Sequence, residues 1–207
     1  MSTRVKICGI TNLEDALVSL EAGADLLGFV FAPSSRRIEP EEAARIGSRL
    51  PAGIARVGVF VNETQARMRE IARMAGLTMI QLHGDEPPEM EESLGMEVLR
   101  AIRVRDLASA LGRARLGSAT ALLIEPAVPS SSGGTGTTMD WGIARDFVAA
   151  VPERRVFLAG GLGPDNVREA IAAVHPYGVD ASSRLEQSPG RKSPELIRRF
   201  VEAARQT

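Results

Sequence analysis

The feature that most constrains the fold of this 207-residue chain is a strand-helix unit that recurs about every 25 residues along its length. Short runs rich in β-forming residues alternate with amphipathic helical patterns. The predicted strands cover residues 5–10, 25–31, 56–61, 79–82, 97–103, 121–124, 155–158 and 178–180. Strands that are apolar on both sides indicate a parallel sheet covered by helices. Eight such units predict an α/β fold, a closed (β/α)8 TIM barrel, as a single domain over residues 1–207.

An open doubly wound sheet is the structural alternative. Such a sheet more often has five or six strands and carries a glycine fingerprint directly after its first strand. Here the first turn reads CGITN, and the number of strand-helix units is larger. Both observations favour the barrel.

Local signals predict where several helices begin. Thr11 and Glu14 have the spacing of a capping box at the first helix. Pro164 can occupy the first helical position of the seventh helix, and Ser193 before Pro194 marks the start of the last. In the first helix the predicted buried stripe comprises Leu13, Ala16, Leu17 and Leu20.

Composition and charge exclude several classes of protein. Hydrophobic residues make up 44% and charged residues 25% of the chain, which is typical of a soluble globular domain. The net charge of -1 provides no field of one sign, so we expect no nucleic-acid or membrane partner. Only Lys6 and Lys192 are lysines among 25 basic residues, which we interpret as a coding bias towards arginine.

The single cysteine, Cys8, rules out an intramolecular disulfide and hence a disulfide-stapled secreted domain. The sequence MSTRVKICGIT contains no apolar signal core, and no apolar run approaches the length of a membrane span. We therefore expect a cytoplasmic location.

Two segments interrupt the repeating pattern, residues 126–138 and residues 182–192. Both follow predicted strands, at the end of the barrel where (β/α)8 enzymes carry their chemistry. The string SSSGGTGTT within the first resembles a nucleotide-binding P-loop but lacks the lysine that such a loop needs, so we reject that interpretation.

Cys8 and Lys6 lie two residues apart on the first strand, so both side chains should point into the barrel lumen. An ammonium group close to a thiol favours the thiolate, which can act as a general base or a nucleophile. The alternative is that Cys8 is a small buried apolar residue without a chemical role.

Glycine and serine turns after the last two strands predict an anion site. LAGGLGPDN places Gly160 and Gly161 just before a helix, where backbone amides can approach a phosphate closely. Ser182 and Ser183 follow the eighth strand and add hydroxyl groups. Each turn alone could be an ordinary connection, but together they occupy the position where many barrels bind a substrate phosphate.

Three further residues are candidates for the site. Glu125 ends the sixth strand and could be a general acid or a solvated loop carboxylate. Arg36 follows the second strand and could pair with a carboxylate or phosphate, whereas its neighbour Arg37 is expected at the surface. His83 follows the fourth strand and could be functional or structural; without metal-ligand spacing around it, we expect no metal.

A set of motifs in order along the whole chain resembles one family. The strings are VKICGIT, GFVFAPSSRRI, VGVFVN, IQLHGDE, GGTGTTMDW, LAGGLGPDNV and VDASSRLEQSPGRK. They are similar to the successive signatures of phosphoribosylanthranilate isomerases of tryptophan biosynthesis. The resemblance implies a barrel that carries out an Amadori rearrangement of a small phosphorylated substrate, without any cofactor. It leaves the oligomeric state open between a monomer and a homodimer.

The resemblance also implies roles for individual residues. Cys8 matches the base that removes the proton from sugar C2, and Glu125 matches the acid that protonates the ring oxygen. Substrate-binding roles are implied for Lys6, Arg36, Gln81, His83 and Asp180, with Asp180 orienting either sugar hydroxyls or Lys6. Phosphate-binding roles are implied for Gly160, Gly161, Ser182, Ser183 and Arg184.

The chain departs from the family pattern at two of these positions. The family usually has aspartate where this chain has Glu125, which lengthens the acidic side chain by one methylene. It usually has glycine where this chain has Arg184. If that turn required a positive φ, Arg184 would carry a strain of about 1–3 kcal/mol; otherwise it could contact phosphate or point into solvent.

Two other functions remain open at this stage. One is a related aminoaldose isomerase whose substrate has two phosphates, although no second glycine-rich cradle follows strands three and four. The other is a degenerate paralogue that binds a phosphorylated ligand without turning it over, which the departures at Glu125 and Arg184 suggest.

Overall fold

The computed structural model describes residues 2–127 and 139–206. The barrel strands are β1 Arg4–Cys8, β2 Leu26–Val30, β3 Ala55–Phe60, β4 Met79–Leu82, β5 Glu97–Val104, β6 Ala121–Pro126, β7 Arg155–Leu158 and β8 Gly178–Ala181. The helices are α1 Leu13–Glu21, α2 Pro40–Gly47, α3 Gln65–Ala75, α4 Glu89–Ser93, α5 Leu107–Leu116, α6 Trp141–Ala150, α7 Val167–Val174 and α8 Pro194–Arg205. All eight predicted strands are confirmed, with bounds that differ by no more than two residues. The SSSGGTGTT string lies outside the described residues.

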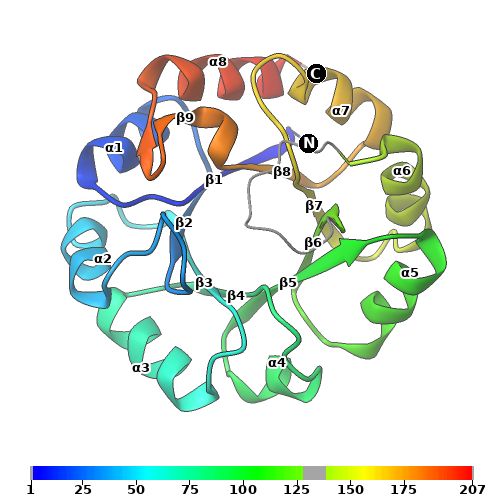
Figure 1. The fold of residues 1–207 in the computed structure, drawn as a ribbon, viewed down its shortest axis with the longest axis horizontal. Helices are drawn as coiled ribbons and strands as arrows, with labels where there is room; N and C mark the ends of the chain where they lie inside the picture. Colours follow the sequence, from blue (N-terminus) through cyan, green and yellow to red (C-terminus); the bar gives the residue numbers. More distant parts are fainter. Residues whose placement is uncertain (1, 128–138, 207) are drawn as a thin grey trace.

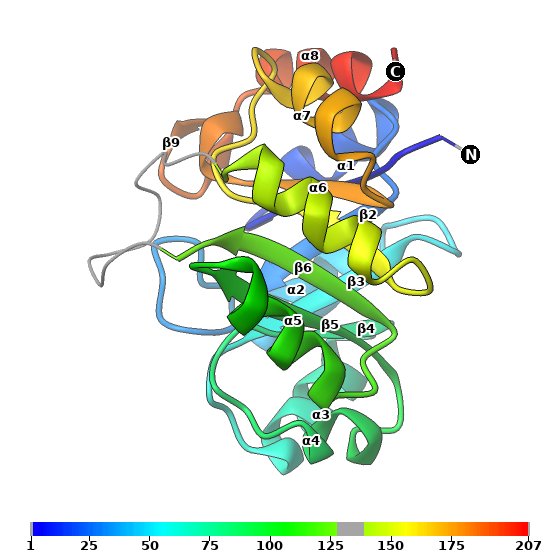
Figure 2. The same ribbon diagram turned by 90° about the vertical axis from the view of Figure 1, so that its right-hand side faces the viewer.

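The eight strands form a closed parallel barrel in sequence order, and β1 pairs with β8 to close it. Figure 1 looks along the barrel, with the helices arranged as an outer ring around the strands. Figure 2, turned by 90°, shows α5 and α6 in front of the strands they cover. The predicted fold class is therefore confirmed. None of the helices within the described ranges is long and apolar enough to cross a membrane.

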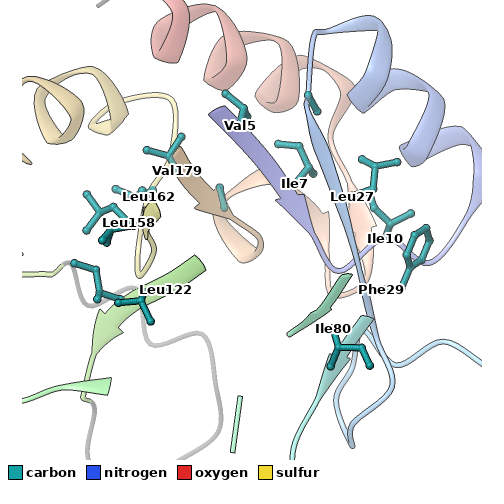
Figure 3. Close-up of a cluster of buried hydrophobic side chains, with 14 of the residues drawn as sticks. Val5, Ile7, Ile10, Leu27, Phe29, Ile80, Leu122, Leu158, Leu162 and Val179 are labelled. Carbon is teal, nitrogen blue, oxygen red and sulfur yellow. The ribbon is translucent and has the colours of Figure 1, made fainter. Parts of the chain in front are cut away.

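Alternation along the strands divides the core into two layers, because successive side chains point to opposite faces. Val5 and Ile7 of β1 point outward and pack in the large cluster between strands and helices, part of which Figure 3 shows. A smaller apolar cluster fills the lumen, with Val57, Leu99 and Leu123 among its members. Lys6 points into the lumen between Val5 and Ile7, as the alternation predicts.

The first helix begins differently from the prediction. Asn12, not Thr11, is the N-cap of α1, and its side chain accepts a hydrogen bond of 2.9 Å from the backbone N–H of Asp15. Thr11 instead donates its hydroxyl to the carbonyl of Gly190 at 2.5 Å. Leu17 is 38% exposed, so it does not belong to the buried stripe. The capping-box prediction was wrong because the Thr11 hydroxyl has a long-range partner that a local pattern does not contain.

The later helix starts are mixed. Pro164 lies in the turn before α7, and Asn166 directly precedes the first helical residue, so the predicted position for Pro164 was wrong. The prediction for the last helix is confirmed. Ser193 caps α8 by accepting from the backbone N–H of Leu196 at 3.4 Å, and Pro194 occupies the first turn.

The irregular segment after β8 has a defined structure. It contains the 3-10 turn η1 Ser183–Leu185 and a hairpin of β9 Glu186–Ser188 with β10 Arg191–Lys192. The hairpin is fastened to the start of α1, since the backbone N–H of Lys192 donates to the Asp15 carboxylate at 2.9 Å. Figure 1 shows it beside α1 at the rim of the barrel.

A buried cluster of charged side chains joins three of the chain segments that connect strands and helices. Arg100 of β5 donates to Glu91 at 2.7 Å and to Glu86 at 3.1 Å, and all three side chains are almost fully buried. Glu91 also accepts the backbone N–H of Ala119 at 2.6 Å, and Glu86 accepts that of Asn62 at 2.8 Å. Arg100 therefore fixes the chain segments after β3 and β4 and before β6.

Replacing Arg100 with methionine should lower the free energy of unfolding by about 3–5 kcal/mol, because two carboxylates would be left buried without their cation. Urea denaturation measures the change. The matched control is Arg113→Met, which removes an exposed pair with Asp85 at 3.9 Å and should cost less than about 1 kcal/mol. Equal effects of the two substitutions would contradict the buried-cluster assignment.

Candidate active site

The carboxyl end of the barrel collects the predicted site residues. Five of the candidate residues lie at lumen-facing positions on the strands, and the remaining candidates lie in the loops that follow strands. The residues on strands are Lys6 and Cys8 on β1, Gln81 on β4, Glu125 on β6 and Asp180 on β8. The residues in loops are Arg36, His83, Gly160, Gly161, Ser182, Ser183 and Arg184, the last two in the short turn η1.

Lys6 and Asp180 form an ion pair across the seam between β1 and β8. Their Cα atoms are register partners in the sheet, and Lys6 Nζ lies 2.7 Å from Asp180 Oδ1. The Lys6 side chain is 0% exposed and that of Asp180 is 11% exposed. Burial lowers the pKa of Lys6, but Asp180 and Cys8 outweigh it, so the pKa lies above its ordinary value. Lys6 is thus a buried cation beside the only thiol.

Cys8 points into the lumen two residues further along β1 than Lys6. Its sulfur packs directly over Gly28 of β2, where an added Cβ would lie only 2.7 Å from Sγ. Burial raises the pKa of the Cys8 thiol, and Asp180 adds to this, while Lys6 and Lys192 oppose it. The resting side chain is therefore a thiol with two cations that favour its deprotonated form.

Glu125 is held by one residue on the neighbouring strand β5 and one residue that directly follows β4. His83 Nε2 lies 2.9 Å from Glu125 Oε1, and Arg103 Nε on β5 lies 3.7 Å from the same oxygen. Burial raises the pKa of Glu125, but His83, Arg103 and Lys6 outweigh it and leave the pKa below its ordinary value. The carboxyl group is therefore ionised in the free protein at neutral pH.

His83 is itself oriented by Gln81. The amide Nε2 of Gln81 lies 2.7 Å from His83 Nδ1. The other ring nitrogen of His83, Nε2, faces Glu125. Gln81, His83 and Glu125 thus form a chain of three hydrogen-bonding side chains. Sequence reasoning missed Arg103, although strand alternation places it beside Glu125 in register.

Arg36 does not project freely into the mouth of the barrel. Its Nε and Nη2 atoms donate to the two carboxylate oxygens of Glu186 at 2.7 and 2.8 Å. Lys192 Nζ lies 3.0 Å from Glu186 Oε1. Sequence reasoning missed Glu186 and Lys192, since both lie about 150 residues from Arg36 and no local pattern links them. The available signal was that Glu186 and Lys192 lie in the same segment, residues 182–192, as the predicted turn at Ser182 and Ser183.

The two predicted phosphate turns lie next to each other. Gly160 has a φ of +90°, and a Cβ there would come within 2.1 Å of Pro126 Cδ, so only glycine fits. Arg184 Nη1 donates to the carbonyl of Gly161 at 3.2 Å and thereby joins the turn after β8 to the turn after β7. The backbone of Ser182 is fixed in turn by Lys192, which donates to its carbonyl at 3.1 Å.

Arg184 is not strained. Within the described ranges, only Asn62 and His175 have a positive φ among non-glycine residues, so the strain considered for Arg184 is excluded. Nor does its side chain point freely into solvent, because Nη2 lies 2.6 Å from Asp165 Oδ2. Arg184 therefore ties the turn after β8 to the turn after β7.

A closed (β/α)8 barrel with a thiol, a carboxyl group and paired glycine and serine turns at its carboxyl end is typical of enzymes that carry out acid-base chemistry on phosphorylated ligands. The sequence profile of the family described as N-(5'phosphoribosyl)anthranilate (PRA) isomerase matches residues 5–203. The chain belongs to this family.

Individual relatives are similar over their full length. The N-(5'-phosphoribosyl)anthranilate isomerase of Pelobacter propionicus is 47% identical over 205 residues, covering 99% of this chain and 96% of the relative. The crystal structure of phosphoribosyl anthranilate isomerase from Thermus thermophilus matches with a TM-score of 0.88 at 41% identity, covering 97% of this chain and 98% of that one.

Two further structures bear on ligands and assembly. A phosphoribosyl anthranilate isomerase in complex with reduced 1-(o-carboxyphenylamino)-1-deoxyribulose 5-phosphate matches with a TM-score of 0.85 at 40% identity, covering 99% of this chain and 100% of that one. A structure described as generated monomers of the dimeric enzyme from Thermotoga maritima matches with a TM-score of 0.84 at 40% identity and the same coverage.

The raised pKa of Cys8 predicts that its alkylation by iodoacetamide has a pH midpoint above that of the same cysteine in the denatured chain. Lys6→Met should move the midpoint further up, because it removes the nearest cation and leaves Asp180 in place. Mass spectrometry of the modified protein measures the rate at each pH. A midpoint at or below that of the denatured chain would contradict the electrostatic account of this site.

Proposed function

We propose that this protein isomerises N-(5-phosphoribosyl)anthranilate to 1-(2-carboxyphenylamino)-1-deoxyribulose 5-phosphate, an Amadori rearrangement in tryptophan biosynthesis. The observation that carries the proposal is the placement of Cys8 and Glu125 on lumen-facing positions at the same end of the barrel, above the buried cation of Lys6. Membership of the isomerase family supports the choice of substrate.

The substrate is proposed to bind through its two anionic groups. The phosphate is received by the turns at Gly160, Gly161, Ser182 and Ser183, with Arg184 holding the two turns together. The carboxylate is received by Arg36, whose planar guanidinium suits bidentate pairing. Asp180 is available to accept a sugar hydroxyl, since its second oxygen is not used by Lys6.

The first chemical step is general acid catalysis by Glu125. Its carboxyl group gives a proton to the ribose ring oxygen, the bond from that oxygen to C1 breaks, and the nitrogen lone pair forms a C1=N double bond. Glu125 is ionised in the free protein and therefore gains its proton once substrate binds. The proton comes from solvent, and the negative charges of the substrate favour its uptake by Glu125.

The second step is general base catalysis by Cys8. The thiolate removes the proton from C2, the electron pair forms a C1=C2 bond, and the C1=N electrons move to nitrogen. The resulting enol tautomerises to the C2 ketone of the product. Lys6 favours the thiolate and opposes the larger effect of burial, and Cys8 releases its thiol proton to solvent before this step. Neither step needs a cofactor, because no net oxidation or group transfer occurs.

The longer acid is supported by its surroundings. Glu125 replaces the usual aspartate, and a displacement near 1 Å can cost about a hundredfold in rate. His83 and Arg103 contact the same oxygen of Glu125 and hold the carboxylate in one position. We propose that this pair compensates for the additional methylene.

The setting of the reaction is also proposed. The chain is expected to act as a single barrel domain in the cytoplasm, as a monomer or a homodimer. The dimeric relative from Thermotoga maritima supports the second state.

Isomerase turnover tests the proposed function directly. The native protein should convert freshly generated phosphoribosylanthranilate, with loss of anthranilate fluorescence, whereas Cys8→Ala and Glu125→Gln should each reduce kcat by about 10²- to 10⁴-fold. Arg113→Met, at an exposed site on α5, serves as the control and should retain native kcat.

A native protein that binds the reduced product but does not turn over substrate would favour a degenerate binding protein instead. Turnover that survives in Cys8→Ala would remove the thiol from the mechanism while leaving the family assignment intact.

A further inference from the structure

The two lysines of this chain share an unusual environment. Lys6 and Lys192 both have side chains that are 0% exposed, and both pair with a carboxylate next to the site. A coding bias towards arginine explains why lysines are few, but it does not explain why both remaining lysines are buried in ion pairs there. Lys6 has a role in the proposed mechanism, whereas the pairing of Lys192 with Glu186 has none so far.

Glu186 connects Lys192 to the substrate site through Arg36. A guanidinium carries five N–H groups, and Glu186 occupies two of them, on Nε and Nη2. The three remaining N–H groups lie on Nη1 and Nη2, along the outer edge of the fork. This edge can still pair with a second carboxylate, so Glu186 orients Arg36 without blocking it.

The pair formed by Arg36 and Glu186 needs a third charged side chain to keep a net positive charge. Arg36 and Glu186 alone would cancel, and a neutral pair would attract a substrate carboxylate only weakly. Lys192 adds one positive charge on the buried side of Glu186, at 3.0 Å, so that the trio carries a net charge of one. The exposed fractions are 18% for Arg36, 5% for Glu186 and 0% for Lys192, so the excess charge is presented through Arg36.

The pKa shift of Glu186 agrees with a net charge of one for the trio. Burial raises the pKa of Glu186, but Arg36 and Lys192 outweigh it and leave the pKa below its ordinary value, so the carboxylate is ionised at neutral pH. Burial lowers the pKa of Lys192 and outweighs the opposing Glu186 carboxylate, so this pKa lies below its ordinary value. The same ammonium also donates to the Ser182 carbonyl in the phosphate turn.

We propose that Lys192 is a positioning residue for substrate recognition. It balances the charge of Glu186, so that Glu186 can orient Arg36 while Arg36 keeps the positive charge that binds a carboxylate. The proposal rests on the proposed function in one respect, namely that Arg36 receives the carboxylate of the substrate. It assigns specificity for a carboxylate-bearing ligand to a residue that does not contact the ligand.

Calorimetric titration with two probes tests the proposal. The first is reduced 1-(o-carboxyphenylamino)-1-deoxyribulose 5-phosphate, and the second is the same compound without the carboxyl group. Lys192→Met should weaken the first probe about tenfold more than the second, because both lose the Lys192 bond to the Ser182 carbonyl but only the first needs the charge of Arg36. Arg36→Met is the reference for complete loss of carboxylate selectivity.

The double variant Glu186→Gln with Lys192→Met provides the decisive comparison. It removes one negative and one positive charge, so the trio regains its net charge of one, and selectivity should return to within about threefold of the native protein. A purely structural role predicts that the double variant is no better than Lys192→Met. Equal weakening of both probes, or no rescue in the double variant, would overturn the proposal.

Native turnover of phosphoribosylanthranilate is measured beside these titrations. Binding reports on the charge balance even in a protein without turnover, so a failure of the proposed function and a failure of this inference give different results.

Discussion

The ion pair between Lys6 and Asp180 is the interaction on which the site most depends. It joins the first and last strands of the barrel at the seam where the ring closes, with a nitrogen-oxygen distance of 2.7 Å and an unexposed lysine. A cation buried in the lumen is costly unless it is paired, so the closure of the barrel and the placement of the charge depend on each other. Cys8 lies directly above this pair, and its thiolate is stabilised by the same ammonium.

The remaining site elements extend outward from this seam. The chain that leaves β8 forms a turn proposed to bind phosphate, then the hairpin β9–β10, and continues into α8. Within this one segment Arg184 is bonded to the turn after β7, Glu186 is paired with Arg36, and Lys192 is paired with Glu186. The turn after β7 and the Arg36 side chain are therefore held by one continuous stretch of sequence that is itself bonded to the start of α1.

In the free protein, neither of the two proposed catalytic groups is in the protonation state that its chemical step needs. Cys8 holds its proton because burial outweighs the nearby cations, whereas Glu125 has lost its proton because His83 and Arg103 outweigh burial. The productive state needs the opposite arrangement. Binding of an anionic substrate favours a proton on Glu125, and this couples recognition of the ligand to readiness for the first step.

Sequence reasoning predicted the barrel and the gathering of the candidate residues at its carboxyl end, because both depend on periodic or local patterns. Strand alternation sufficed to place Lys6 and Cys8 in the lumen, and turn composition located the glycine and serine loops. Partners that lie far apart in the chain could not be predicted in this way. The Thr11 hydroxyl bonds Gly190, Arg36 bonds Glu186, and Arg184 bonds Asp165, and in each case the partner is supplied by folding of the ring.

The crystal structure of this protein with the reduced product bound tests the central claim most directly. The account predicts the phosphate against the turns at Gly160 and Ser182, the sugar between Cys8 and Glu125, and the carboxylate on the outer edge of Arg36 with its Glu186 contacts intact. A ligand bound at the opposite end of the barrel, or a carboxylate that displaces Glu186 from Arg36, would contradict it.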